Sequence, residues 1–172
     1  MADIERANQN KSVKAIIKDD EGLGLQTVTA YFNPKEVSIK KPVPWQKHKD
    51  SKSDSPMLEF TAAEPRTMDL ELLFDTYESD SPTSVYAAYI KDLEQYTLVN
   101  ASLKRPPMCL FVWGSFGRVF KVVITNLAVK YTLFLPDGTP VRATATISFQ
   151  QADKASVKQT PKSTPRPAPG AP

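Results

Sequence analysis

The chain has 172 residues, of which 41% are hydrophobic and 24% charged, with a formal net charge of +3. This length suits one domain, and a domain of roughly 150 residues buries about 68–70% of its unfolded surface without needing disulfides or metals. The first twenty residues contain acids and no apolar run, and no stretch approaches the ~18 apolar residues of a membrane span. We therefore expect no signal peptide, no membrane contact and synthesis in the cytoplasm.

The chain is predicted to begin with a β-hairpin. Residues 12–18 and 26–32 have the composition of strands, and the acids and glycines of 19–24 between them are typical of a turn.

Residues 40–57 interrupt the strand pattern. They hold five lysines, two acids and one tryptophan. A structureless segment of this length inside a compact domain is uncommon and tends to be functional or disordered. We expect either an arm that becomes ordered against a neighbouring subunit, with Trp45 as its aromatic anchor, or a plain mobile loop.

A strand and then a helix are predicted after this segment. Residues 67–74 alternate strictly between apolar and polar side chains, which indicates a strand with one buried face. Ser81 and Pro82 suit the N-cap and first residue of a helix that ends before Asn100. Its apolar residues recur at helical spacing: Val85, Tyr86, Tyr89, Ile90, Leu93 and Tyr96.

The last part of the domain is again β. Residues 118–135 are too long for one ordinary strand, and a slip in the alternation near Thr125 indicates a bulge or two successive strands. Residues 136–140 form a tight turn around Asp137 and Gly138. In 141–149 the apolar side chains share one face and four polar ones the other: Arg142, Thr144, Thr146 and Ser148. We expect about seven or eight antiparallel strands with one helix.

Residues 151–172 differ in composition from the rest of the chain. They contain five prolines in the last twelve positions and the whole net charge of +3, which leaves the first 150 residues neutral. Such a segment buries too little apolar surface to order itself and is typical of a semi-rigid linker. We divide the chain into a β domain (1–150) and a basic, Pro-rich tail (151–172). Either a segment beyond Pro172 was removed, or the tail itself docks on a partner.

Groups for catalysis or metal binding are scarce. The only histidine, His48, lies between two lysines that make it a poor base, and the only cysteine, Cys109, lies in an apolar run where burial is expected. Together they cannot supply the four close ligands of a zinc site, and no phosphate-binding glycine loop occurs. We predict no enzymatic activity, no cofactor and no metal site.

Three segments of the chain resemble the tube proteins of contractile injection systems: YFNPKEVSIKKPVPW (31–45), LEFTAAEPRTMDLELLFDTYE (58–78) and residues 105–149, with their RPP, WG and PDG motifs. More narrowly, they are similar to the N-terminal domain of the tail-tube initiator or adaptor that joins the inner tube to the spike. Members of that group often continue into a LysM-like module, whereas this chain ends in its Pro-rich tail.

The resemblance implies a structural subunit with a tail-tube-like β-sandwich or barrel, assembled as a hexameric homo-oligomeric ring. Its implied partners are the inner tube protein, a VgrG-like spike protein and baseplate components. The implied location is a phage-tail-like particle that is assembled in the cytoplasm and becomes extracellular on release. The polar strand face would line the lumen or face solvent. Interface positions would be Trp45, Lys47, Lys49, Asp137 and Gly138, although Asp137 and Gly138 equally suit simple turn chemistry.

Two other classes of function are open. One is a peptidoglycan-binding or cell-wall-anchoring accessory protein, which follows from the usual association with LysM modules. The other is an oligonucleotide-binding barrel, which stacks bases on exposed aromatic rings in a basic groove. The neutral body and the core positions of the aromatic residues argue against nucleic-acid binding.

Overall fold

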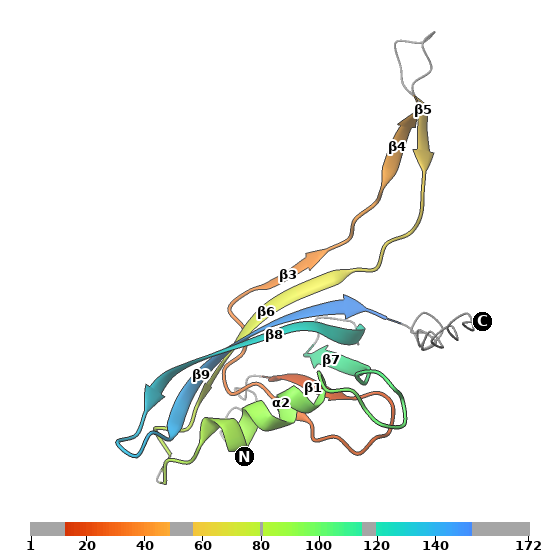
Figure 1. Ribbon diagram of the computed structural model, residues 1–172. Coiled ribbons are helices and arrows are strands. Elements are labelled where there is room, and N and C mark those ends of the chain that lie inside the picture. Colours follow the sequence, from red (N-terminus) through yellow and green to blue (C-terminus); the bar gives the residue numbers. More distant parts are fainter. Residues whose placement is uncertain (1–12, 49–56, 80, 115–119, 153–172) are drawn as a thin grey trace, which may run out of the picture.

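The computed structural model describes residues 13–48, 57–79, 81–114 and 120–152. Seven strands form one antiparallel sheet in the order β2-β1-β7-β8-β9-β6-β3, and β4 and β5 form a separate ribbon (Figure 1). The bounds are Ala15–Asp19 (β1), Val28–Thr29 (β2), Val37–Lys40 (β3), Trp45–His48 (β4), Met57–Phe60 (β5), Thr67–Asp75 (β6), Cys109–Trp113 (β7), Phe120–Phe134 (β8) and Pro140–Gln151 (β9). The predicted mainly β fold with one helix is confirmed. The sheet does not close into a barrel, because among the described residues its end strands β2 and β3 do not pair with each other.

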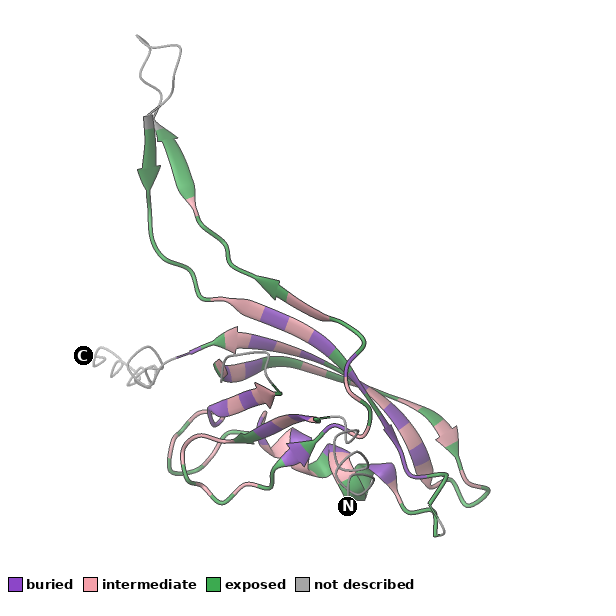
Figure 2. Ribbon diagram, turned by 180° about the vertical axis from the view of Figure 1, so that it is seen from behind, coloured by how far each residue is buried: buried purple, intermediate pink, exposed green. Residues whose placement is uncertain are grey.

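The long strands β6, β8 and β9 form the centre of the sheet. The predicted alternation in β6 and β9 is confirmed, because every second residue of each strand is buried (Figure 2). β8 is a single strand of 15 residues whose register against β9 shifts between Ile124 and Asn126. The slip that the sequence shows at Thr125 is therefore a bulge, which lets one strand continue past a break in its alternation.

One helix covers a face of the sheet (Figure 1). It consists of a π-helical turn (η1, Tyr86–Ile90) followed by α2 (Lys91–Gln95). The predicted start at Ser81 and Pro82 is wrong, because the Ser81 carbonyl accepts a hydrogen bond from the Ser79 hydroxyl (2.9 Å) within the preceding loop. The helix ends at Gln95, before Asn100 as predicted, and the Thr97 N–H and hydroxyl both donate back to the Glu94 carbonyl (2.8 and 2.7 Å).

The hydrophobic core lies between this helix and the sheet. Phe74 of β6 stacks on Tyr89 of the helix with ring centroids 5.0 Å apart. The ring centroids of Phe111 on β7 and Phe149 on β9 lie 5.9 Å apart. Tyr96, at the helix end, is fully buried and donates its hydroxyl hydrogen to the Gln26 carbonyl (2.8 Å), which joins the helix to the N-terminal hairpin. Each such buried aromatic side chain stabilises the fold by about 2–3 kcal/mol.

The predicted N-terminal hairpin is confirmed as β1 paired with β2. Its turn is fixed to the rest of the domain by an ion pair between Glu21 Oε1 and Arg105 Nη2 (2.6 Å), and Glu21 also accepts the Met108 N–H (2.8 Å). The Arg-Pro-Pro motif thus has a structural role, which is to attach the start of β7 to the first turn.

Residues 40–57 are only partly the structureless segment that was expected. The chain leaves β3, runs through two prolines into β4, and β4 pairs with β5 as an antiparallel ribbon that projects away from the sheet (Figure 1). The pattern within residues 40–57 did not predict β4. The reason is that β4 is paired with β5, most of which lies beyond this segment and ends at Phe60. We call residues 41–48 and 57–66 the arm; residues 49–56, including Lys49, lie outside the described residues.

Candidate assembly surfaces

The face of the sheet opposite the helix carries the four polar residues predicted on β9. Arg142, Thr144, Thr146 and Ser148 point to the same side, and the residues between them are buried in the core. Most of their neighbours across β8 and β6 continue the same character: Asn126, Ala128 and Lys130 on one side, Asp69, Glu71 and Asp75 on the other. Leu73, which lies opposite Thr144 and is 37% exposed, is an apolar exception. The structure therefore brings the predicted residues together in one broad, mostly short-chained polar surface, which we call the polar face.

The charges on the polar face balance one another. The Asp75 carboxylate, which is nearly buried, accepts hydrogen from Arg142 Nε (2.7 Å) and lies 2.6 Å from Arg142 Nη2. Lys40 Nζ lies 3.5 Å from Asp69 Oδ2. Among the described residues of β3, β6, β9 and the part of β8 after the bulge, the face holds three acids and three bases, namely Asp69, Glu71, Asp75, Lys40, Lys130 and Arg142. A surface of this kind is wetted without attracting ligands of one charge strongly.

Asp137 and Gly138 form the tip of the β8–β9 hairpin. The Gly138 N–H donates to the Leu135 carbonyl (2.9 Å), and Gly138 has φ +85°, in the left-handed region that favours glycine. The Asp137 carboxylate accepts the Thr139 N–H (2.9 Å), and this hydrogen bond lowers the pKa of Asp137. Both residues have a full structural explanation as a turn followed by a left-handed residue.

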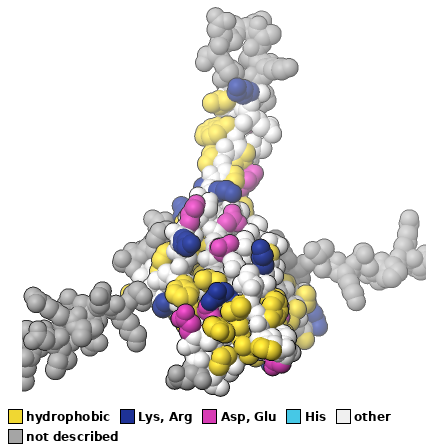
Figure 3. Space-filling model, turned by 90° about the vertical axis from the view of Figure 1, so that its left-hand side faces the viewer, with side chains coloured by type: hydrophobic (Ala, Val, Ile, Leu, Met, Phe, Trp, Pro, Cys, Tyr) yellow, Lys and Arg dark blue, Asp and Glu magenta, His cyan; other side chains and the backbone are white. Residues whose placement is uncertain are grey.

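The arm presents one apolar side. Trp45 and Phe60 lie directly opposite each other in the ribbon, with ring centroids 5.6 Å apart, and Lys47 lies opposite Leu58. Because residues two apart on a strand share a face, these four side chains lie on the same side. Trp45, Leu58 and Phe60 are 56%, 57% and 48% exposed, and Figure 3 shows hydrophobic side chains along the arm. Exposed apolar area of this kind marks an interaction surface.

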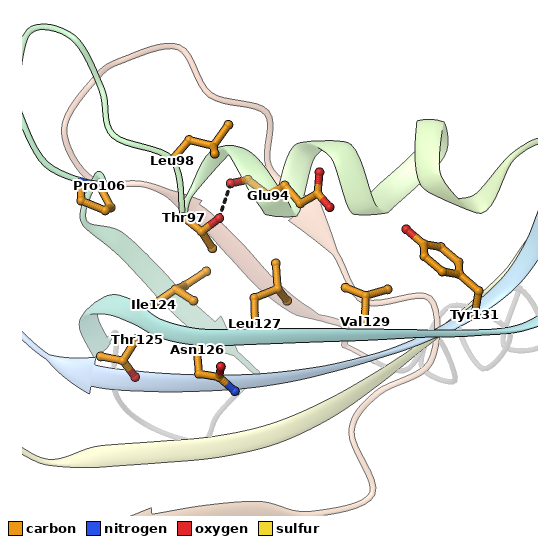
Figure 4. Close-up of a pocket in the computed structure, with 10 residues that line it drawn as sticks. All are labelled: Glu94, Thr97, Leu98, Pro106, Ile124, Thr125, Asn126, Leu127, Val129 and Tyr131. Carbon is orange, nitrogen blue, oxygen red and sulfur yellow. Dashed lines mark hydrogen bonds between the residues drawn. The ribbon is translucent and has the colours of Figure 1, made fainter.

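A groove of about 700 Å³ lies between the helix and β8 (Figure 4). Its floor is formed by Leu127, Val129 and Tyr131, which point from β8 toward the helix, and its far wall by Glu94 and Leu98. The nearby Glu94 carboxylate and burial together raise the pKa of Tyr131, with burial the larger cause. Sequence reasoning missed this groove. The sequence pattern that could have predicted it is the apolar alternation of β8. This alternation resumes after the bulge, with the apolar side chains facing the helix.

Among the described residues, the side chains considered for catalysis or metal binding are not gathered into one site. Burial raises the pKa of the Cys109 thiol to about 12, and its Sγ donates to the Val122 carbonyl (3.6 Å). His48 pairs with Met57 in the ribbon. In the part of the chain that the structure describes, no three His, Cys, Asp or Glu side chains are arranged to hold a metal ion. Within the same residues, no helix has the length and apolar character needed to cross a membrane.

The model of the contractile injection system tube protein family matches residues 7–160, which is most of the chain. The chain belongs to this family. A search of curated proteins finds no match. As a tube protein it is a structural subunit of a phage-tail-like particle, and it assembles with other tube and particle components. The predicted resemblance is thereby confirmed at the level of the family.

Proposed function

We propose that this tube protein forms a homo-oligomeric, hexameric ring that joins the inner tube to the spike and baseplate hub. The observation that carries the ring is the open sheet. β8 pairs with β7 through residues 120–122 alone, so among the described residues its longer part has no partner on that side. At the other end, β3 pairs with β6 and has no second neighbour in the sheet. Unpaired edges are liabilities in a lone subunit and interfaces in an assembly.

Strand direction supports edge-to-edge joining. β8, β9, β6 and β3 alternate in direction because each neighbouring pair is antiparallel. If β3 of one copy lies beside β8 of the next, the new pair is antiparallel as well. The contact uses two different surfaces of the chain, and such heterologous contacts form a ring when the rotation from copy to copy closes.

The same arrangement favours a lumen on the polar face. The helix adds a second layer on one side of the sheet, and a second layer fits best on the outer side of a curved wall, where the circumference is larger. The polar face, with Arg142, Thr144, Thr146 and Ser148, would then line a water-filled channel. The position at the spike and hub rests on the similarity of the sequence to the tube initiator or adaptor.

Cysteine cross-linking tests the ring. Ser38 of β3 and three residues of β8 (Asn126, Ala128 and Lys130) share the polar face. A chain with Ser38→Cys is mixed with a second chain in which Asn126, Ala128 or Lys130 is replaced by cysteine. A cross-linked dimer should form for the β8 position that lies opposite Ser38, and this position gives the register of the two strands. Val99→Cys, 68% exposed and outside the sheet, is the control. Edge-to-edge joining would be contradicted if the yield of cross-linked dimer at all three β8 positions were no higher than in the control.

The position in the particle is tested separately. Electron microscopy of particles that carry a labelled copy of this chain should place the label at the junction of tube and spike. A label distributed along the whole tube would show an ordinary tube subunit, and retention of the isolated protein on cell wall would instead favour the anchoring function.

A further inference from the structure

The geometry points to the groove between the helix and β8 as the docking site for the arm of a second copy of this chain, with Lys47 of the arm facing Glu94 of the groove. The inference rests on the proposed self-assembly and deepens it. It names a contact that is separate from the edges of the sheet.

The groove has the shape and chemistry of a site for an amphipathic segment. Leu127, Val129 and Tyr131 give it an apolar floor, and Glu94 supplies the one charged side chain among its described lining residues. The Glu94 carboxylate also accepts a hydrogen bond from the Tyr86 hydroxyl at 3.2 Å, which holds it at the groove. A partner that fills this groove should be apolar with one positive charge.

The arm meets that description. Its apolar side carries Trp45, Leu58 and Phe60 with a single lysine, Lys47, beside them. This side of the ribbon therefore complements the groove in both polarity and charge. Aromatic anchors that enter a pocket, with a charge pair to fix their orientation, are the usual composition of strong protein contacts.

The arm is placed to reach another molecule. It projects away from its own sheet (Figure 1), and an extended segment at roughly 3.3 Å per residue covers about 25 Å from Lys41 to His48. The base of the ribbon is held together by the Lys41 ammonium, which donates to the Glu64 carbonyl, and by the Thr61 N–H, which donates to the Pro44 carbonyl (3.3 Å). An arm and a groove on one chain make a heterologous contact, which repeats from copy to copy.

Charge reversal tests the pairing. In sedimentation measurements on the full chain, Lys47→Glu and Glu94→Lys should each weaken self-association by about tenfold or more, because each puts two like charges together at an interface. The chain with both substitutions should recover to within about threefold of the original. Gln46→Ala, on the opposite side of the arm, and Asp92→Lys, on the helix but not among the groove-lining residues, are the controls. Glu94→Gln, which keeps an acceptor for Tyr86, separates loss of charge from loss of local structure.

The outcomes are distinct. The arm-in-groove contact would be overturned if the single charge reversals left self-association unchanged. It would also be overturned if the double variant associated as weakly as expected from adding the effects of the two single reversals. If the Ser38 cross-links still form in that case, the ring stands and only this inference fails. A wild-type chain that stays monomeric at all concentrations would overturn both. If ending the chain at Ala152 weakens association while Lys47→Glu does not, the tail occupies the groove and the inference is wrong.

Discussion

Arg142 shows how one residue can serve a surface and the fold together. Its alternation in the sequence placed it on the polar face, and the structure adds that its guanidinium neutralises Asp75, whose side chain is 9% exposed. Without that partner the carboxylate keeps the Tyr77 N–H (2.9 Å) as its described hydrogen-bond donor. A nearly buried charge left with so little compensation is unfavourable.

Arg142→Leu should therefore lower the free energy of unfolding by about 1–3 kcal/mol, less than for a fully buried pair because the Arg142 side chain is 38% exposed. Lys130→Leu, an exposed position on the same face, should change it by no more than about 0.5 kcal/mol. Urea unfolding of both variants is the measurement. Equal effects would mean that the Asp75 ion pair adds nothing to stability.

Gly138 is a second residue whose role is local. An alanine Cβ at this position would meet no atom within 4 Å, so the penalty of Gly138→Ala comes from its φ of +85° alone. We expect a loss of about 1–2 kcal/mol in thermal or urea unfolding, without loss of ring formation. A variant that folds with unchanged stability but no longer assembles would instead make the hairpin tip an interface.

At the scale of elements, the strands with a regular period could be predicted and the features set by distant partners could not. In β6 and β9 every second residue is apolar, which predicts the buried face of each strand. The bulge in β8 corresponds to a break in the apolar alternation at Thr125. The start of the helix was misplaced because Ser81 and Pro82 suit a helix cap, yet the loop before the helix uses them. The ribbon, the groove and the Asp75–Arg142 pair depend on residues far apart in the sequence, and no local pattern reports them.

The arm should change its dynamics on assembly. A lone two-stranded ribbon is marginally stable in water, so the amides of β4 and β5 should exchange quickly with solvent in the free subunit and slowly in the assembled particle. The amides of β6 and β9 should exchange slowly in both and provide the internal reference. Equal rates for the arm in the two states would argue that it remains outside every interface.

Trp45→Ala isolates the anchor within the arm. The substitution should weaken ring formation by about 2 kcal/mol or more and leave the unfolding of the subunit nearly unchanged, because the Trp45 side chain is 56% exposed in the single chain. Gln46→Ala, on the other side of the ribbon, should do neither. Concentration-dependent sedimentation and urea unfolding give the two quantities, and a large loss of subunit stability would make Trp45 part of the fold.

For the molecule as a whole, the sheet continues slightly past residue 150, where composition places the start of the tail. β9 continues to Gln151, which pairs with Val122, and Ala152 is 7% exposed with its N–H donating to the Lys121 carbonyl (3.1 Å). The remaining residues, 153–172, lie outside the described part of the chain. Gln151 therefore belongs to the sheet, and Ala152 is hydrogen-bonded to it.

A truncation series locates this boundary. A chain that ends at Ala152 should melt within about 2 °C of the full chain, since it keeps every described contact. A chain that ends at Ser148 loses Phe149, which is 1% exposed and lies opposite Met68 and Ile124, and should be destabilised by about 3–5 kcal/mol or fail to fold. A large drop in melting temperature for the first truncation would show that the tail belongs to the folded domain.

The burial of Cys109 has a consequence for a protein that works in many identical copies. In a regular assembly every surface residue recurs at short intervals, so one reactive thiol per chain would become a row of thiols at high local concentration. Disulfide exchange requires the thiolate, and with a pKa raised to about 12 the buried Cys109 thiol stays protonated at neutral pH. Even in oxidising surroundings, Cys109 would therefore not link the assembled chains covalently to one another.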